Sequence, residues 1–301
     1  MVWHANSGNM ADATTRFRES IESEGILVAP GAYDAVSARL VEDAGAEVVY
    51  MSGSSVSTSV HGYPDVGLTT LTEMTDRARA MVGAVDVPVF ADADTGYGNS
   101  INVYRTVEEF EAAGVAGIHL EDQAFPKRCG HFEGKDVVAT DEMVARLRAA
   151  ADARTDDDFV LVARTDARAV EGFEAAVERS RAYSEAGADV IFFEAPESVD
   201  ELEAVAERID APLLANMTEG GKTPMLTAAE LDELGYDVAL FPATGFKAVL
   251  KTLGDLYAEI VEKGTQQDAM DDLVTWEGRN EITGLDRIRD LEDRYAVDRD
   301  A

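Results

Sequence analysis

The sequence predicts one α/β domain, a (β/α)8 TIM-type barrel with extra helices at its C-terminal end. From residue 26 onward, short apolar runs alternate with longer amphipathic stretches, and the apolar runs number eight. Several amphipathic stretches end on glycine, which is typical of a helix terminus because glycine adopts positive φ easily. An open, doubly wound sheet is the alternative that the same alternation allows.

The eight predicted strands are apolar runs bounded by turn residues. In chain order they are ILVA from 26, EVVYM from 47, VPVFA from 87, AGIHL from 116, FVLVA from 159, DVIFF from 189, PLLAN from 212 and DVALF from 237. The helices between them include AYDAVSARLVEDAG, EEFEAAG, DEMVARLRAAADA, FEAAVERSRAYSEAG and AAELDELG. Strands and helices therefore alternate as a parallel barrel requires.

Both ends of the chain exceed what a barrel needs. Residues 1–25 are predicted to form an N-terminal extension, and residues 26–263 are predicted to form the barrel with its last helix from about Thr244. Residues 264–301 are predicted to add two helices that cap the barrel or pack on a neighbouring subunit. Because no low-complexity linker divides residues 1–301, we expect a single domain.

The charge balance excludes several classes of partner. The chain has 59 acidic and 26 basic residues, a formal net charge of -33. Such a surface repels phosphate backbones and anionic lipids, so we expect neither nucleic acid nor membrane as a partner. Arginines number 20 and lysines 6, and the acids are spread along the whole chain. We expect a halophilic protein whose self-repulsion is screened by salt, with an acidic mesophilic enzyme as the alternative.

Localisation is predicted to be cytoplasmic. No apolar run approaches the roughly 18 residues that span a bilayer, and the N-terminal segment lacks the apolar core of a signal peptide. The single cysteine cannot form an internal disulfide, which fits a reducing compartment.

Polar residues follow nearly every predicted strand. In a barrel of this kind, residues at the carboxyl ends of the strands form the active site. We therefore expect one mouth lined by Tyr50, Ser52, Gly53, Ser54, Asp92, Asp94, His119, Glu121, Asp122, Arg164, Asp166, Glu194, Asn216 and Thr218.

Asp92 and Asp94 form a candidate metal site with Glu121 close by. The two aspartates lie two residues apart after an extended run, so both side chains can project to one side. Carboxylates suit Mg²⁺, or Mn²⁺ in its place, and the chain contains neither of the zinc motifs CxxC and HExxH. In the alternative, Asp94 begins a turn and Asp92 alone faces the site.

Cys129 lies in the polar segment PKRCGHFEGK, flanked by Lys127, Arg128, His131 and Lys135. Neighbouring cations favour the thiolate, as a general acid/base or a nucleophile requires. The alternative is a cysteine buried as a small apolar residue. Arg164 is expected to grip a substrate carboxylate or to form a structural salt bridge.

Six segments occur in order across about residues 26–250: YMSGSSVS, VFADADTGYGN, GIHLEDQAFPKRCGH, ARTDA, IFFEAP and LANMTEGGKTP. In these six segments the sequence resembles members of the isocitrate lyase and phosphoenolpyruvate mutase superfamily. The KRCGH motif resembles that of the lyase branch, and LANMTEGGKTP is most similar to the 2-methylisocitrate lyases. Three positions differ from that group: Ser54 replaces a glycine, Lys247 replaces an arginine, and the loop reads HFEGK, as in dimethylmalate lyase-like enzymes.

The resemblance implies a role for each site residue. Asp92 and Asp94 would hold Mg²⁺, while catalysis would fall to Cys129, Tyr50, Glu121 and His131. The substrate would be bound by Ser52, Gly53, Ser54, Gly130, Arg164, Glu194, Asn216, Thr218, Lys247 and Arg279. Supporting or undecided roles are left to Asp65, His119, Lys127 and Arg128.

The implied activity is retro-aldol-type cleavage of the small molecule 2-methylisocitrate to pyruvate and succinate, a step of the 2-methylcitrate cycle of propionate metabolism. Isocitrate, 2,3-dimethylmalate and oxaloacetate are alternative substrates within the superfamily. A catalytically silent metabolite-binding protein is the alternative outside enzymes. The resemblance also implies a homotetramer in which the C-terminal helices are swapped between subunits.

Overall fold

The computed structural model of the protein describes residues 10–128, 130 and 134–296. Its strands pair in parallel with their sequence neighbours and form a closed barrel. They are β1 (Leu27–Ala32), β2 (Val49–Met51), β3 (Val89–Asp92), β4 (Gly117–Glu121), β5 (Val160–Thr165), β6 (Val190–Phe193), β7 (Leu213–Asn216) and β8 (Val238–Phe241). Leu27 of β1 pairs with Val238 of β8, which closes the barrel. The predicted barrel is confirmed, and the open sheet is excluded.

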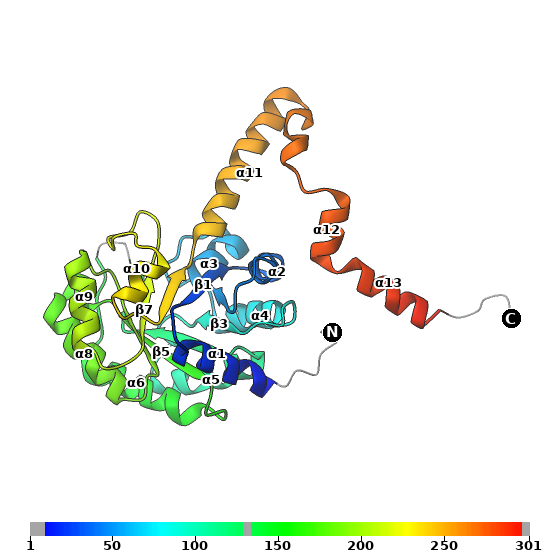
Figure 1. Ribbon diagram of the computed structural model, residues 1–301. Helices are drawn as coiled ribbons and strands as arrows, with labels where there is room; N and C mark the ends of the chain where they lie inside the picture. Colours follow the sequence, from blue (N-terminus) through cyan, green and yellow to red (C-terminus); the bar gives the residue numbers. More distant parts are fainter. Residues whose placement is uncertain (1–9, 129, 131–133, 297–301) are drawn as a thin grey trace. The chain divides into compact units, whose positions relative to one another are not determined.

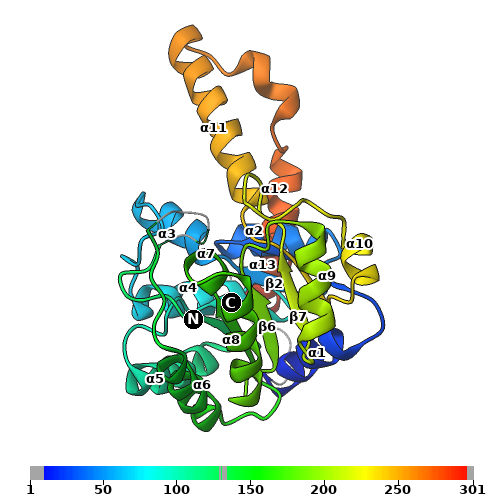
Figure 2. The ribbon, with the colours of Figure 1, turned by 90° about the vertical axis from the view of Figure 1, so that its left-hand side faces the viewer.

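Helices α2 to α10 connect the strands and lie outside them, whereas α1 precedes β1 (Figures 1 and 2). In the first part of the chain the helices are α1 (Met10–Glu22), α2 (Ala35–Asp43), α3 (Gly53–His61), α4 (Leu71–Val82), α5 (Ser100–Ala113), α6 (Thr140–Ala153), α7 (Ala167–Val170), α8 (Phe173–Glu185), α9 (Val199–Arg208) and α10 (Ala228–Glu233). Among the described residues, no helix is long and apolar enough to cross a membrane.

The chain divides into two compact units, Met1–Phe246 and Lys247–Ala301. The barrel belongs to the first unit. The second contains most of α11 (Thr244–Lys263), the 3-10 helix η1 (Gln267–Asp272), α12 (Trp276–Thr283) and α13 (Leu285–Arg294). The two helices predicted after residue 264 are thus present as α12 and α13, and η1 precedes them. The single-domain organisation stays a prediction.

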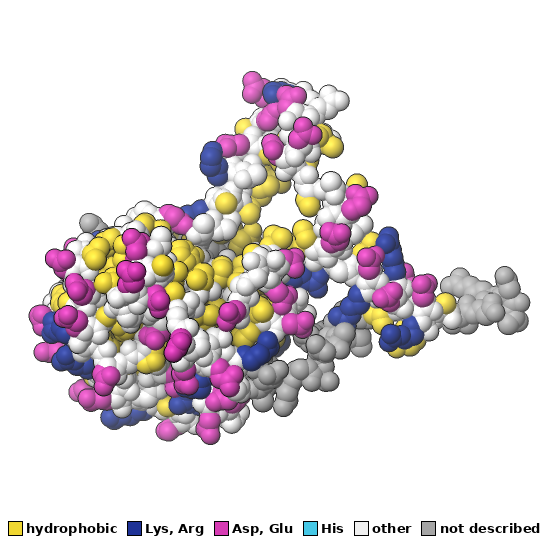
Figure 3. Space-filling model, viewed as in Figure 1, with side chains coloured by type: hydrophobic (Ala, Val, Ile, Leu, Met, Phe, Trp, Pro, Cys, Tyr) yellow, Lys and Arg dark blue, Asp and Glu magenta, His cyan; other side chains and the backbone are white. Residues whose placement is uncertain are grey.

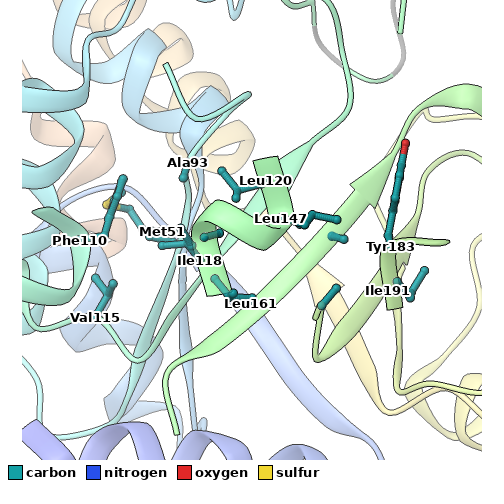
Figure 4. Packing of buried hydrophobic residues seen from close by; sticks show 14 of the residues in the cluster. Met51, Ala93, Phe110, Val115, Ile118, Leu120, Leu147, Leu161, Tyr183 and Ile191 are labelled. Carbon is teal, nitrogen blue, oxygen red and sulfur yellow. The ribbon is translucent and has the colours of Figure 1, made fainter. Parts of the chain in front are cut away.

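The larger core cluster lies between the strands and the helices of the barrel (Figure 4). Ile118 of β4 and Leu161 of β5 belong to it together with Phe110 of α5 and Leu147 of α6, and all four side chains are at least 99% buried. In β2 to β7 every residue is buried, which explains why these strands read as continuous apolar runs in the sequence. In β1, by contrast, Val28 is 40% exposed.

A second core cluster fills the interior of the barrel, and α1 contributes Phe17 and Ile21 to it. The Phe17 ring stacks on that of Phe90, with the centroids 5.2 Å apart and the planes at 19°. Phe17 also approaches Gly117, the first residue of β4. The helix in the predicted N-terminal extension is therefore part of the barrel core at the amino ends of the strands.

Candidate active site

Most of the predicted mouth residues surround one cavity of about 60 Å³. It is lined by Tyr50, Ser52, Ser54, Asp65, Asp92, Glu121, Lys127, Arg128, Gly130, Arg164, Phe192, Glu194, Asn216, Thr218, Leu240, Pro242 and Ala243. Four of these residues were not predicted from the sequence: Phe192, Leu240, Pro242 and Ala243. Apolar residues in or just after a strand look like core residues, so composition alone gave no signal for them.

The turn from β2 into α3 brings three small residues to this mouth. Ser52 is the N-cap of α3, and its side chain accepts a hydrogen bond from the Ser55 backbone N–H at 3.4 Å. A Cβ atom on Gly53 would lie 2.3 Å from Oδ2 of Asp92. Only glycine therefore lets the first turn of α3 approach this carboxylate so closely.

Three carboxylates gather at the ends of β3 and β4. Asp92 and Asp94 are each 7% exposed, and Glu121 is 3% exposed. The Asp94 backbone N–H donates to Oδ1 of Asp92 at 2.9 Å. Asp94 has a φ of 48° and begins the turn after β3, yet its carboxylate stays buried in the cluster. The turn of the alternative interpretation is present, and of the two aspartates only Asp92 lines the cavity, while Asp94 is buried beside Lys127.

Lys127 is the cation that offsets this acidic cluster. Its Nζ atom lies 2.6 Å from Oδ1 of Asp94 and 2.5 Å from Oδ1 of Asp65. Burial raises the pKa of Asp94 to about 7, against the opposing effect of Lys127. Burial also raises the pKa of Asp92 and holds that of Glu121 well above its usual value. A cation bound among these carboxyls would oppose this effect of burial and favour their ionised forms.

The donor set fits Mg²⁺. Asp92, Asp94 and Glu121 offer oxygen atoms alone, and Oε1 of Glu121 is buried without a hydrogen-bond partner among the described residues. Within that part of the chain, no three His, Cys, Asp or Glu side chains are placed to ligate one ion together, so the protein would supply at most two of these carboxylates as ligands. Mg²⁺ is commonly bound by one or two carboxylates and completes its shell with water and substrate oxygens.

His119 lies behind Asp92. Its Nε2 atom is 2.6 Å from Oδ1 of Asp92, and the side chain is fully buried. Burial lowers the pKa of His119 to about 3, so the imidazole is neutral at physiological pH. This position favours a role in orienting Asp92 over direct contact with a substrate.

Arg164 lines the cavity and is held by acids. Its Nε and Nη2 atoms donate to Asp166 at 2.8 and 3.1 Å. Nη2 lies 3.8 Å from Oε2 of Glu194, to which Nδ2 of Asn216 donates at 3.2 Å. The guanidinium also lies 4.9 Å above the centroid of the Phe192 ring. The structural salt bridge that the sequence allowed is present, and the same side chain borders the cavity.

Of the predicted site residues, Gly53, Asp94 and His119 belong to the cluster around Asp92 without lining the cavity. For four others, contact with this mouth stays a prediction. Cys129 and His131 lie outside the described residues, and their roles stay predictions. Lys247 on α11 and Arg279 on α12 belong to the second unit, where the Arg279 guanidinium lies 4.9 Å above the Trp276 ring. Their contact with a substrate also stays a prediction.

Comparison with known proteins assigns the chain to a family. The family described as phosphoenolpyruvate phosphomutase matches residues 17–261. The chain belongs to the phosphoenolpyruvate mutase and isocitrate lyase superfamily. It is 46% identical over 288 residues to 2,3-dimethylmalate lyase of Eubacterium barkeri, which covers 96% of this chain and 100% of the relative. It is 49% identical over 279 residues to 2-methylisocitrate lyase of Aeropyrum pernix, covering 93% and 89%.

Solved structures of this superfamily share the fold. A crystal structure of 2,3-dimethylmalate lyase matches with a TM-score of 0.89 and 38% identity, covering 94% of this chain and 95% of the other. Phosphonopyruvate hydrolase in complex with oxalate and Mg²⁺ matches with a TM-score of 0.86 and 30% identity, covering 95% and 99%. The relatives confirm the predicted enzyme class, a carbon–carbon lyase of this superfamily.

Proposed function

We propose that the protein is a Mg²⁺-dependent lyase that cleaves 2-methylisocitrate to pyruvate and succinate. The observation that carries this proposal is the composition of the cavity, where the carboxylates and Arg164 stand beside an apolar wall of Phe192, Leu240 and Pro242. Bound metal and Arg164 suit the carboxylates of such a substrate, and the apolar wall suits its methyl group. The similarity to 2-methylisocitrate lyase of Aeropyrum pernix supports the same choice.

A second candidate substrate is 2,3-dimethylmalate. The chain aligns with the whole length of the Eubacterium barkeri 2,3-dimethylmalate lyase at 46% identity. This substrate also carries methyl groups for the apolar wall, but it has one carboxylate fewer than 2-methylisocitrate. The two candidates therefore differ in the number of cationic contacts that they need.

The proposed cleavage is a retro-aldol step. Mg²⁺, held by Asp92 and Asp94, would stabilise negative charge on the hydroxyl and carboxylate oxygens of the substrate. Glu121 would accept the hydroxyl proton through its buried Oε1 atom once a cation bound beside it favours its ionised form over the effect of burial. The O–H electron pair forms the carbonyl of pyruvate as the carbon–carbon bond breaks, and the electrons of that bond pass to the succinate half. Arg164 stabilises the charge there, and Cys129 donates its thiol proton to the carbon.

Tyr50 acts as a hydrogen-bond donor in this proposal. Burial, with the nearby Asp92 charge, raises the pKa of Tyr50 well above its usual value of 10.0. The phenol therefore keeps its proton at physiological pH, and it suits the binding of a developing oxyanion better than the removal of a proton.

A substrate panel tests the proposal. The enzyme with Mg²⁺ is incubated with 2-methylisocitrate, 2,3-dimethylmalate, isocitrate and oxaloacetate, and the products are separated. Pyruvate with succinate supports the first candidate, and pyruvate with propionate the second. Glyoxylate, or oxalate with acetate, would contradict both. Absence of turnover on every compound, with binding retained, would favour a silent metabolite-binding protein.

Exchange of Cys129 for serine tests the proton donor. The hydroxyl is far less acidic than a thiol, so we expect kcat to fall by about 100-fold or more, within the range of general acid catalysis. Binding of the substrate, measured by calorimetry with Mg²⁺ present, should change little. Near-normal turnover in Cys129→Ser would refute the assignment.

We also propose that the enzyme works in the cytoplasm as a homotetramer with swapped C-terminal helices. The second unit supports this, because α11 to α13 present apolar side chains to solvent, among them Tyr257 at 59% and Trp276 at 71% exposure. Light scattering of the full chain tests the assembly, and a monomeric mass would contradict it.

A further inference from the structure

Lys135 is a buried lysine just outside the cavity lining. It is 7% exposed, and the residues that line the cavity do not include it. Its Nζ atom donates to the carbonyl oxygen of Gly130 and to Oδ1 of Asp166, the latter at 2.6 Å. The side chain thus joins the segment that follows β4 to the end of β5.

Asp166 is a fixed anchor for this contact. It is fully buried, and its backbone N–H donates to Asp122 at 2.8 Å. Asp122 is itself held by Thr165 Oγ1 at 2.7 Å and Tyr183 OH at 2.8 Å. Although burial opposes it, the neighbouring cations Arg164 and Lys135 hold the pKa of Asp166 well below its usual value. The carboxylate is therefore ionised and bound on both sides.

Gly130, the other residue that Lys135 binds, lines the cavity. A Cβ atom on Gly130 would lie 2.3 Å from Nη2 of Arg164 and 2.5 Å from Oε1 of Glu194. Its main chain therefore lies directly against two groups that border the cavity. The carbonyl oxygen of the same residue, Gly130, accepts the hydrogen bond from Lys135.

We propose that Lys135 is a positioning residue that ties Gly130 to the Asp166–Arg164 pair. One ammonium group sets the distance between the main chain at Gly130 and the guanidinium of Arg164. Because Asp166 binds both Lys135 and Arg164, the positions of Gly130 and Arg164 are both fixed relative to this one carboxylate. The catalytic consequence rests on the proposed function, in which Gly130 and Arg164 meet the substrate.

The first test compares Lys135→Met with Lys135→Arg in the full-length enzyme. Methionine keeps much of the length and loses every donor, whereas arginine can restore both contacts. With the substrate that the wild type cleaves fastest, kcat of Lys135→Met should fall by about 10- to 100-fold, the scale of a misplacement of about 1 Å. Calorimetric affinity for oxalate with Mg²⁺ should change less than about threefold, because Asp166 still orients Arg164. Lys135→Arg should recover part of kcat.

Arg208→Met is the matched control. It removes a cation that also pairs with a carboxylate, Glu174 at 2.7 Å, on the surface of the barrel. We expect this variant to keep the wild-type kcat. A Lys135→Met enzyme with the kcat of this control would overturn the proposal, as would an equal loss of kcat and oxalate affinity.

A second measurement does not depend on turnover. The chain holds one cysteine, the neighbour of Gly130, so a thiol reagent reports on this position alone. We expect the rate of thiol modification in Lys135→Met to rise at least threefold over wild type and Arg208→Met. An unchanged rate would overturn the proposal even if the substrate panel succeeds. A raised rate would support it even if every substrate of the panel fails.

Discussion

Gly53 sets the approach of α3 to the proposed metal ligand Asp92. A Cβ atom there would lie 2.3 Å from Oδ2 of Asp92, so Gly53→Ala must displace the carboxylate or the helix. We expect the affinity for Mg²⁺ to fall by about 10- to 100-fold, as for other residues that orient metal ligands. Calorimetric titration of the apoenzyme with Mg²⁺ measures the change.

Gly254→Ala is the control for this prediction. Its added Cβ would meet nothing within 4 Å, and the residue lies within α11. Helix propensity favours alanine over glycine, so the variant should fold and bind Mg²⁺ as the wild type does. Equal Mg²⁺ affinities in the two variants would show that the crowding at Asp92 has no effect.

Many individual site residues could be predicted because they lie at the ends of predicted strands. Asp92, Glu121 and Arg164 each come at the end of a strand, and the barrel brings all strand ends to one mouth. Phe192 could not be predicted, because an apolar residue in a strand looks the same whether it borders a cavity or fills the core. Lys135 could be predicted as a cation near Cys129, but its contact with Asp166 could not. Its partner Asp166 lies 31 residues away, and no periodicity links the two.

At the scale of elements, the strands were predictable and the role of α1 was not. A strand of a closed parallel barrel is covered on both faces, so its apolar run stands out in the sequence. The amphipathic pattern of α1 shows that one face is buried, but it does not name the partner of that face. The structure supplies the partner, since Phe17 stacks on Phe90 inside the barrel.

Removal of the Phe17 ring tests how much α1 stabilises the barrel. The side chain is 1% exposed, so Phe17→Ala leaves a cavity at the amino ends of the strands. We expect the free energy of unfolding to fall by about 3–5 kcal/mol, measured by urea denaturation. Ile101→Ala, which truncates a side chain that is 77% exposed on α5, should change it by less than about 0.5 kcal/mol. A loss below about 1 kcal/mol in Phe17→Ala would mean that α1 docks without stabilising the barrel.

At the scale of the whole molecule, acidic side chains outnumber basic ones. Figure 3 shows Asp and Glu side chains over both units on the face in view, with fewer Lys and Arg. The 59 acids exceed the 26 basic residues by 33, so at least 33 acids cannot be matched one to one with a basic residue. Local pairs such as Arg208 with Glu174 neutralise only part of this charge. Repulsion between acids therefore opposes the folded state at low ionic strength.

Salt should stabilise this protein well beyond physiological concentrations. The Debye length falls from about 10 Å at 0.1 M to about 3 Å at 1 M, which removes the repulsion between neighbouring acids before the shortest ion pairs are lost. We expect Tm and lyase activity both to rise with KCl into the molar range. Choline chloride at equal ionic strength should act alike if screening is the cause, whereas a stabilisation seen with KCl alone would indicate bound K⁺. If Tm or activity were highest below about 0.2 M KCl, salt adaptation would be contradicted, because the repulsion between surface acids would then need no further screening.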